Sequence, residues 1–315
     1  PKLSPLVHRF SLNKEKEGFS LVEIFKIFNF IRKRNFDVVH IHGFFYYYAF
    51  SVYLLHSKVK FIYTIHSDAK KENSVWDRRL FFLKKNAFRC GYIHPITISK
   101  ESKRSFTNLY GVDSTLIYNG IPCPEKETIT SSVSKYKKTD ETIIFFHPGR
   151  ISQAKNQLVL VKVFSRLISE GKDVVLLIAG SKQDLNIFRT IQPFFSDRII
   201  YLGEVSNVRD LLAESDAFCL PSIWEGMPIT LFEALSAECI PICSPVGGIP
   251  EIIDSGNNGF LSKDSTESSY YMAVCEYLQS TKEQISKMKV QCKKTFENFT
   301  ISKVAKKYID VYKYK

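Results

Sequence analysis

The sequence predicts an α/β protein of two domains, each built on a parallel sheet that helices cover. Three observations predict this fold class. The chain has 315 residues, which is enough for two domains with their own cores. Continuous runs of Val, Ile, Leu and Phe alternate with amphipathic stretches, as in strands that are buried on both faces and joined by crossover helices. A segment rich in Pro, Ser, Thr and Lys, residues 119–140, interrupts this alternation and is predicted to link the domains.

The first domain, residues 1–138, shows the pattern less completely. Residues 19–35 are predicted as a helix. The apolar runs that are predicted as strands are residues 36–43, 60–67 and 93–100.

The second domain, residues 139–295, alternates strands and helices more regularly. Residues 156–171 are predicted as a helix. The apolar runs that are predicted as strands are residues 142–149, 173–180, 198–205, 216–222, 240–246 and 258–262. Residues 296–315 are predicted as a terminal helix that carries Lys on its polar face.

Composition narrows the class of protein. Hydrophobic residues make up 44% of the chain and charged residues 24%, as in globular proteins. The seven cysteines form no Cys-x-x-Cys pair and have no clustered His partners, so a disulfide framework and a zinc module are not expected, and a reducing cytoplasm fits. No apolar run reaches the roughly 18 residues of a membrane span, and no signal-peptide pattern is present. The chain begins at Pro1 rather than Met, which suggests a segment upstream.

Positive charge is concentrated in the first part of the chain. Residues 1–140 hold 24 Lys and Arg against 12 Asp and Glu, whereas residues 141–315 hold 20 of each kind. Two interpretations stay open: an anionic partner such as a phospholipid headgroup or lipid phosphate, and a basic surface that merely keeps the protein soluble. Nucleic acid is not the expected partner, because the basic residues are not interleaved with an RNA-binding signature.

Two glutamates stand close together in the stretch SIWEGMPITLFEAL, residues 222–235. Glu225 follows a predicted strand, at the sheet edge where open parallel sheets bind ligands. Glu233 lies in the helix that follows, roughly 7.5 Å further along its axis. The two carboxylates could therefore bind hydroxyl groups on different parts of one long ligand.

The start of that helix offers a second feature. Gly226 and the amides after it leave the helix N-terminus open to an anion such as phosphate, and Pro228 suits the first helical turn. The alternative for Glu225 alone is a carboxylate that stabilises the helix dipole.

Two cations and a histidine follow other predicted strands. Arg150 and Lys155 lie after residues 142–149, at the same sheet edge, and could neutralise a diphosphate; the alternative is two solvated surface cations. His66 ends a strand of the first domain, where a lone histidine is more often structural than catalytic. His40 and His42 share one face of their strand and are interpreted as core or rim residues.

Several common motifs are absent from the sequence. It has no Asp-x-Asp pair for a divalent metal, no Gly-x-x-x-x-Gly-Lys or Gly-x-Gly-x-x-Gly loop and no Gly-x-Ser-x-Gly elbow. No metal and no cofactor is therefore expected. A diphosphate would have to be stabilised by Arg, Lys and helix amides.

The chain resembles a known family in a series of motifs between Asp37 and Leu261. In order they read DVVHIHG, YTIHSD, ITISKES, IYNGI, PGRISQAKN, FCLPSIWEGMPITLFEAL and SPVGGIPEIIDSGNNGFL. With this order and context, the sequence resembles the retaining GT-B glycosyltransferases of family 4.

This resemblance implies a fold and a set of site residues. It implies two Rossmann-like domains that face each other across a cleft, with residues 296–315 crossing back to the first domain. A UDP- or GDP-sugar would be held mainly by the second domain. By position, Arg150 and Lys155 would hold the diphosphate, and Glu233 the ribose. The transferred sugar would be held by Glu225, by the backbone of Gly226, Met227, Pro228 and Ile229, and by His66 from the other domain.

The implied activity is the retaining transfer of a hexose-type sugar to a glycan or lipid-linked acceptor, in surface polysaccharide assembly at the inner face of the plasma membrane. Two alternatives stay open. One is a nucleotide-sugar epimerase or glycan phosphorylase of the same fold. The other is a non-catalytic or truncated partner subunit.

The sequence departs from the family pattern in two places. Nothing before Asp37 matches the usual first strand and its Gly-rich loop, so the first domain is expected to lack that strand. The small Gly that usually follows the second glutamate's helix is interpreted as replaced by Cys239.

Residues 70–90 combine Trp76, Leu80, Phe81, Leu83 and Phe88 with Arg78, Arg79, Lys84, Lys85 and Arg89. A basic amphipathic helix of this kind can lie on an anionic membrane surface. It can equally pack on its own domain, and the sequence does not distinguish the two.

Overall fold

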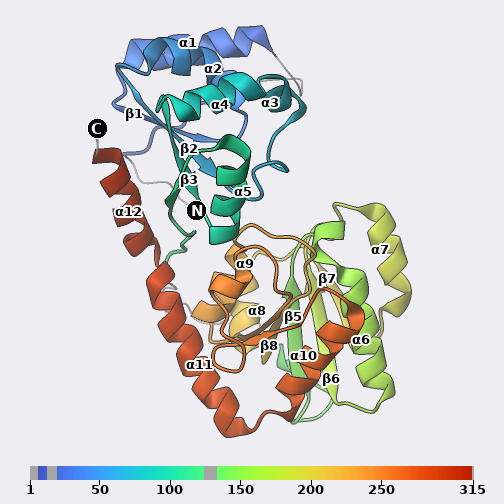
Figure 1. Cartoon of the computed structure of the whole chain (residues 1–315). Coiled ribbons are helices and arrows are strands. Elements are labelled where there is room, and N and C mark those ends of the chain that lie inside the picture. The colour runs from blue at the N-terminus through green and yellow to red at the C-terminus, as the bar shows by residue number, and fades with distance from the viewer. Residues whose placement is uncertain (1–5, 13–19, 124–132, 314–315) are drawn as a thin grey trace. The chain divides into compact units, whose positions relative to one another are not determined.

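The computed structural model describes residues 6–12, 20–123 and 133–313, which form two compact units (Figure 1). The N-terminal unit contains the described residues up to Thr97, Lys103–Leu116 and the chain from Tyr312. The C-terminal unit contains Ile98–Ser102 and Ile117–Val311. The segment 119–140, which we predicted as a linker, includes residues 124–132, which lie outside the described residues.

The N-terminal unit is built on four parallel strands in the order β1-β2-β3-β4. Their bounds are β1 Val38–His42, β2 Lys60–Ile65, β3 Ile93–Thr97 and β4 Thr115–Leu116. The helices in this part of the chain are α1 Leu21–Arg34, α2 Phe45–Leu55, α3 Val75–Arg79, α4 Phe81–Arg89 and α5 Lys100–Tyr110. The strands that we predicted at 36–43, 60–67 and 93–100 are confirmed, as is the described part of the helix at 19–35.

The C-terminal unit contains a six-stranded parallel sheet in the order β10-β9-β8-β5-β6-β7. Its strands are β5 Ile143–Pro148, β6 Val174–Ala179, β7 Ile199–Gly203, β8 Ala217–Leu220, β9 Ile240–Cys243 and β10 Phe260–Leu261. All six coincide with predicted strands, and the two-sheet α/β fold class is confirmed. The side chains of Ile144, Phe145 and Phe146 are fully buried, which explains why β5 reads as a continuous apolar run.

Helices enclose this sheet on both faces. The helices here are α6 Gln157–Ser169, α7 Leu185–Ile191, α8 Val208–Glu214, α9 Ile229–Ser236, α10 Glu267–Gln279, α11 Lys282–Phe296 and α12 Ile301–Lys313. In Figure 1, α6 and α7 lie on one side of the strands, and α8 and α9 lie on the other. The crossover connections therefore leave the carboxyl edge of the sheet free for loops.

The C-terminal segment differs from the single helix that we predicted over residues 296–315. Helix α11 ends at Phe296, a short 3-10 turn follows, and α12 begins at Ile301. The interruption has a physical reason: the chain pairs with another segment at this point. Ile121 donates its amide to the Phe299 carbonyl (3.1 Å), and Ile301 donates its amide to the Ile121 carbonyl (2.8 Å).

Residues 70–90 do not form the single basic helix that we considered. Helices α3 and α4 meet at Leu80, and Ser74 caps α3 through a reciprocal bond with Asp77. Lys84 is buried, at 3% exposure. Its ammonium group donates to the Asn73 side-chain oxygen (2.8 Å) and to the Tyr63 hydroxyl (3.2 Å). Burial lowers the pKa of Lys84, against the opposing effect of Asp77. The interpretation of Lys84 as a surface cation was therefore wrong.

The turn after α9 corrects another interpretation. We assigned the missing Gly to Cys239, but Cys239 is buried immediately before β9 and has no positive φ. The residue in the left-handed conformation is Glu238, with φ 57°. A left-handed residue directly after a helix is usually Gly, because a side chain is strained there.

This strain generates a prediction for stability. Glu238→Gly should raise the free energy of unfolding by about 0.5–1 kcal/mol, because glycine adopts a positive φ without strain. The exposed ion pair between Glu238 and Lys293 (3.2 Å), which the substitution removes, offsets only a few tenths of that gain. The measurement is urea unfolding of the variant and of a Glu238→Ala control, which loses the ion pair but keeps the strain. Equal stability of the Gly and Ala variants would contradict the strain argument.

Candidate functional site

The candidate site lies at the carboxyl edge of the C-terminal sheet, in the loops that follow β5, β8 and β9. Because β8 pairs with β5 and β9 pairs with β8, these three loops leave adjacent strands. Arg150 and Lys155 come from the first loop and Glu225 from the second. The topology thus brings together residues that are more than 60 positions apart in the sequence.

Lys155 and Glu225 form a direct ion pair. The Lys155 Nζ donates to Glu225 Oε1 at 2.6 Å, and the two side chains are only 16% and 11% exposed. The Ser222 hydroxyl donates to the same carboxylate oxygen at 2.6 Å. A partly desolvated pair of this kind holds both charges in one geometry, because either charge alone would be costly there.

The loop that carries Lys155 is anchored from both ends. Lys155 closes a 3-10 turn, and Asn156 follows in the left-handed conformation, with φ 55°. The Asn156 side-chain amide donates to the carbonyls of Pro221 (3.1 Å) and Ser265 (3.2 Å). The amide of Ile223 donates back to the Ala154 carbonyl at 2.8 Å. These hydrogen bonds therefore connect the loops after β5 and β8 in addition to the ion pair.

A buried histidine supports the start of the same loop. His147 in β5 is fully buried, and burial lowers its pKa to about 4. Its Nδ1 bonds the Cys219 carbonyl (2.8 Å), and its Nε2 bonds the side-chain nitrogen of Gln157 (3.1 Å). Gln157 also donates to the Arg150 carbonyl at 2.9 Å. This chain of bonds fixes the backbone from which the Arg150 side chain extends.

The segment after Glu225 packs against two glycines in the loop after β9. Gly248 donates its amide to the Gly226 carbonyl at 2.7 Å. A Cβ at Gly247, which has φ 61°, would collide with the Glu225 carbonyl oxygen. Met227 is buried, and its carbonyl accepts a bond from the Asn119 side chain (3.0 Å). The backbone around Glu225 is thus fixed by close contacts that only glycine allows.

Helix α9 begins immediately after this segment. Pro228 is the residue that precedes the helix, with ψ 124°, rather than a member of its first turn as we predicted, and Ile229 is the first helical residue. The first amides of a helix lack intrahelical partners and favour an anion. The Thr230 hydroxyl is buried without a hydrogen-bond partner in the described structure. Glu233 is half-buried, and burial raises its pKa, against the opposing effect of Arg209.

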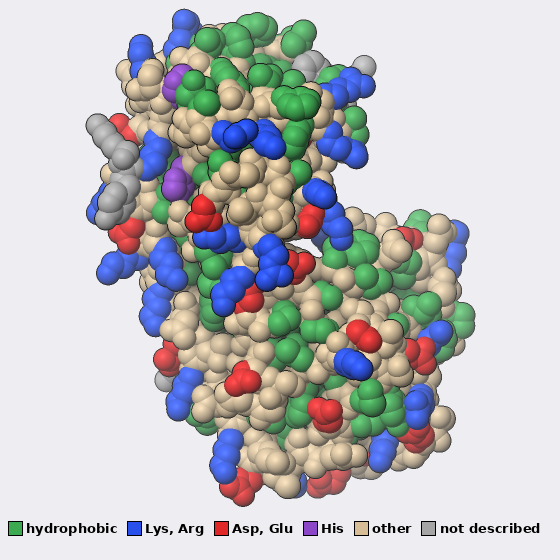
Figure 2. All heavy atoms as spheres, in the orientation of Figure 1, with side chains coloured by type: hydrophobic (Ala, Val, Ile, Leu, Met, Phe, Trp, Pro, Cys, Tyr) green, Lys and Arg blue, Asp and Glu red, His purple; other side chains and the backbone are tan. Residues whose placement is uncertain are grey.

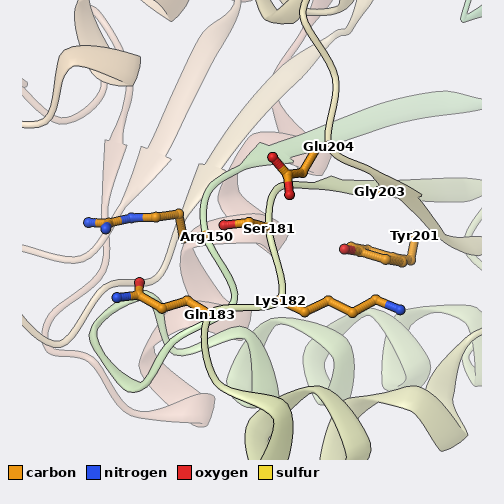
Figure 3. Close-up of a pocket in the computed structure, with 7 residues that line it drawn as sticks. All are labelled: Arg150, Ser181, Lys182, Gln183, Tyr201, Gly203 and Glu204. Carbon is orange, nitrogen blue, oxygen red and sulfur yellow. The ribbon is translucent and has the colours of Figure 1, made fainter. Parts of the chain in front are cut away.

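A cavity of about 780 Å³ opens beside Arg150. Its other lining residues come from the loop after β6, from β7 and from the loop after β7, and are Ser181, Lys182, Gln183, Tyr201, Gly203 and Glu204 (Figure 3). Our sequence reasoning missed these six residues. The available signal was their position at or near the carboxyl ends of two predicted strands. Using this signal required knowing that β6 lies next to β5 and that β7 lies next to β6.

The cavity combines an aromatic ring with groups of both charges. The Tyr201 hydroxyl donates to the Gly180 carbonyl at 2.7 Å, which fixes the ring. The Lys182 ammonium lies 5.4 Å from the Tyr201 ring centre, and Figure 3 shows Arg150 and Lys182 extending in opposite directions. A flat polar ring could stack and hydrogen-bond in such a cavity.

His66, the predicted site residue of the N-terminal unit, follows β2. Its amide donates to Glu72 Oε2 at 2.8 Å, and its Nε2 lies 2.8 Å from Nδ1 of His42. Partial burial lowers the pKa of both His66 and His42. Burial also raises the pKa of Glu72 to about 7. His40 and His42 do share one face of β1, with ring centres 4.3 Å apart, as the sequence predicted.

Neither a metal-binding cluster nor a membrane-spanning helix is present among the described residues. Within residues 6–12, 20–123 and 133–313, no three His, Cys, Asp or Glu side chains form a group that could hold a metal ion. No helix in the same ranges combines the length and the hydrophobicity needed to cross a membrane.

The family of the chain follows from comparison with known proteins. Residues 129–295 match the family described as Glycosyl transferases group 1, and residues 3–124 match Glycosyltransferase Family 4. The chain belongs to the group 1 glycosyltransferases of family 4. The resemblance to family 4 that the motifs indicated is confirmed, and the retaining mechanism stays a prediction.

Several curated proteins are similar to this glycosyltransferase. N-acetyl-alpha-D-glucosaminyl L-malate synthase of Bacillus anthracis is 24% identical over 188 residues, which cover 59% of the chain and 49% of the relative. The Escherichia coli UDP-Gal:alpha-D-GlcNAc-diphosphoundecaprenol alpha-1,3-galactosyltransferase is 27% identical, with 54% and 45% covered. The Staphylococcus aureus capsular polysaccharide glycosyltransferase CapH is 28% identical, with 70% and 63% covered. The chain thus matches about half to two thirds of the length of these relatives.

Solved structures share the fold of this glycosyltransferase. A Rickettsia africae glycosyltransferase aligns with a TM-score of 0.75 at 22% identity. The alignment covers 98% of this chain and 84% of the Rickettsia chain. Anabaena Alr3699/HepE in complex with UDP-glucose aligns with a TM-score of 0.73 at 15% identity, covering 91% and 81%. These likenesses show the GT-B fold.

The partial burial of the ion pair predicts a stability effect. Lys155→Ala should lower the free energy of unfolding of the C-terminal unit by about 2–3 kcal/mol, because it leaves the Glu225 carboxylate without its cation. The measurement is urea unfolding followed by Trp224 fluorescence in a Trp76→Phe background, since these are the only two tryptophans. Lys162→Ala is the matched control: it removes an exposed pair with Glu267 (3.6 Å) and should cost less than about 0.5 kcal/mol. Equal losses in both variants would contradict the prediction.

Proposed function

We propose that this chain is a retaining glycosyltransferase that moves a hexose-type sugar from a UDP- or GDP-sugar to a glycan or lipid-linked acceptor. The observation that carries the proposal is the ion pair of Lys155 and Glu225, which stands at the carboxyl edge of the sheet. Lys155 belongs to the same loop as Arg150, which lines the cavity. Glu225 belongs to the segment that leads into the first turn of α9.

Each part of the donor has a counterpart in this arrangement. The diphosphate would bind Arg150, Lys155 and the first amides of α9, which together supply its positive surroundings. The base would enter the 780 Å³ cavity against Tyr201. Glu233 would accept hydrogen bonds from the ribose hydroxyls. Because protein groups supply the positive charge, we propose that the reaction requires no metal.

Binding of the donor would also rearrange the ion pair. In the free protein the Lys155 ammonium is neutralised by Glu225. A diphosphate would compete for this ammonium, and the carboxylate would then be available to the hydroxyls of the transferred sugar. The backbone of Gly226, Met227 and Ile229 would lie along the same sugar. His66 would contribute from the N-terminal unit.

The proposed reaction proceeds on one face of the sugar. The bond between the anomeric carbon and the diphosphate oxygen breaks, and a bond from the acceptor hydroxyl oxygen to that carbon forms on the same face. The acceptor proton passes to an oxygen of the departing phosphate. The protein would stabilise the charge that develops on the leaving group through fixed cations and amides, which is electrostatic preorganisation rather than nucleophilic catalysis.

The relatives support the substrate class. The name of the Escherichia coli relative gives a UDP-linked donor and a lipid diphosphate acceptor, and the Anabaena structure holds UDP-glucose. The name of CapH places that protein in capsular polysaccharide biosynthesis. We propose for this chain a role in surface polysaccharide assembly at the cytoplasmic face of the membrane.

The proposal predicts which variants lose which step. Arg150→Ala should weaken UDP or GDP binding about tenfold, because it removes one charge-assisted contact to the diphosphate. Glu225→Gln should bind the nucleotide but lose at least a hundredfold in transfer, because the neutral amide binds the sugar hydroxyls more weakly. Calorimetry measures the first effect, and transfer from labelled UDP- and GDP-sugars to membrane-extract acceptors measures the second. Arg189→Ala, an exposed cation of α7, is the control and should change neither.

Other outcomes would identify the alternatives. Epimer formation without acceptor would indicate an epimerase, and an absorbance spectrum of bound pyridoxal phosphate would indicate a phosphorylase. Nucleotide binding without turnover would favour a non-catalytic partner. Inversion of the anomeric configuration in the product would overturn the retaining mechanism.

We also propose that α3 and α4 contact an anionic membrane surface. Val75, Phe82 and Leu83 are 57%, 82% and 44% exposed, and Arg78, Arg79, Lys85 and Arg89 lie among them on the same two helices. Figure 2 shows green hydrophobic and blue basic side chains side by side on the visible face of the unit that carries these helices. Apolar side chains surrounded by cations are complementary to anionic lipid headgroups.

Vesicle flotation tests this contact. The protein should float with vesicles that contain phosphatidylglycerol but not with pure phosphatidylcholine, and 0.5 M salt should weaken the binding because it screens the cations. Phe82→Asp should reduce binding several-fold. Leu185→Asp, at a residue of the C-terminal unit that is 56% exposed, is the matched control. Equal binding of both variants would overturn the assignment of this surface.

A further inference from the structure

We propose that His42 is a positioning residue for His66: its ring occupies Nε2 of His66 and leaves Nδ1 of His66 to accept a hydrogen bond from a sugar hydroxyl. The inference rests on the proposed function, because it assigns His66 to the transferred sugar. It names a residue and a ring nitrogen that the proposed function leaves open.

The register of two parallel strands brings the two rings together. His42 in β1 is paired with Thr64 in β2, and His66 follows two residues after Thr64. Because side chains alternate along a strand, residues two apart lie on one face. His42 Nδ1 lies 2.8 Å from His66 Nε2, and the ring centres are 5.1 Å apart at an angle of 32°. This is a hydrogen-bond distance between two nitrogens.

A third histidine fixes His42 without competing for its nitrogen. The His40 ring lies 4.3 Å from the His42 ring at 32°. Both nitrogens of His40 are already engaged: Nδ1 lies 2.8 Å from the Tyr312 hydroxyl, and Nε2 lies 2.7 Å from the Thr64 hydroxyl. His40 therefore restricts the His42 ring by contact and leaves Nδ1 of His42 for His66.

The backbone of His66 is held independently of its ring. Glu72 accepts the His66 amide at 2.8 Å. Between them, one carboxylate oxygen of Asp68 accepts the amides of Lys70 (2.9 Å) and Lys71 (3.1 Å), which shapes the turn. With the main chain fixed, rotation about the side-chain bonds is the remaining freedom of His66. The bond to His42 removes it.

The tautomer preference of neutral histidine, together with the two nitrogens that are in contact, indicates which nitrogen carries the proton. Partial burial lowers the pKa of both His42 and His66, so the two rings are neutral near pH 7. A bond between neutral imidazoles needs one N–H and one lone pair. Both rings satisfy this in the Nε2–H tautomer, the commoner form of neutral histidine. We therefore assign His66 Nε2–H as the donor to His42 Nδ1.

This assignment defines the ligand that His66 can recognise. Its Nδ1 then carries a lone pair and accepts only from a donor such as a hydroxyl. A phosphate or carboxylate oxygen would meet a lone pair rather than an N–H. His66 is thus suited to a neutral sugar hydroxyl and not to the diphosphate of the donor.

The first test reads the tautomer directly. Long-range ¹H–¹⁵N spectra of the full chain should show an unprotonated Nδ1 and a protonated Nε2 for His66 at pH 7.5. In His42→Phe, which keeps a ring but removes the acceptor, His66 should show a mixture of tautomers and a higher pKa. His42→Asn, which keeps an acceptor near the Nδ1 position, should restore the wild-type pattern. His94→Phe, on β3 of the same sheet, should leave His66 unchanged.

The second test reads function. His42→Phe should lower kcat about tenfold, since one hydrogen bond is lost, with UDP affinity unchanged and with partial rescue in His42→Asn. A sugar donor that lacks the hydroxyl bound by His66 should abolish the difference between His42→Phe and wild type. Circular dichroism confirms that the variants are folded.

The outcomes separate this inference from the proposed function. A protonated Nδ1 in the wild type, or an unchanged His66 tautomer in His42→Phe, would overturn the pairing. Wild-type transfer rates in His42→Phe would overturn the positioning role. An inactive wild type with the expected spectra would overturn the proposed function, while the histidine pairing would stand demonstrated.

Discussion

The ion pair between Lys155 and Glu225 is the constraint on which the candidate site depends. It exists because β5 and β8 are neighbours in the sheet, so the loops that leave their carboxyl ends must meet. Buried pairs add little net stability, since desolvation cancels most of the attraction between the charges. The contribution of this pair is that it holds the Lys155 and Glu225 side chains in fixed positions. The ammonium and the carboxylate each compensate the burial of the other. In the proposed function, the same two groups would bind a diphosphate and the hydroxyls of a sugar.

The sequence predicted those residues of the candidate site that come directly after one strand each. Arg150, Lys155 and Glu225 each follow a continuous apolar run, and one rule about the carboxyl edges of parallel sheets was enough to group them. The cavity residues around Tyr201 were not predictable in the same way. They line one cavity only because β6 lies beside β5 and β7 lies beside β6, and strand order is a property of long-range pairing that local patterns do not encode.

The failures of the sequence reasoning have local physical causes. Lys84 reads as a surface cation, yet its ammonium is satisfied in the interior by Asn73 and Tyr63, and a pattern of charges cannot reveal such partners. The break before α12 arises where the chain pairs with Ile121, far away in sequence. Helix α2 is hydrophobic around most of its circumference, so it lacks the amphipathic period by which a helix is recognised. In each case tertiary contact overrides the local signal.

In the proposed function His66 would contact a sugar hydroxyl, and a neutral partner such as His42 suits this role. A carboxylate hydrogen-bonded to the His66 ring would raise the pKa of that ring and favour the imidazolium form, in which both ring nitrogens are donors. Such a ring would bind the donor's diphosphate as readily as a hydroxyl, and would hold a charge that the reaction does not need. A second imidazole has the opposite effect: it disfavours protonation and leaves one nitrogen of His66 as an acceptor. The choice of partner thereby determines the class of group that the histidine can bind.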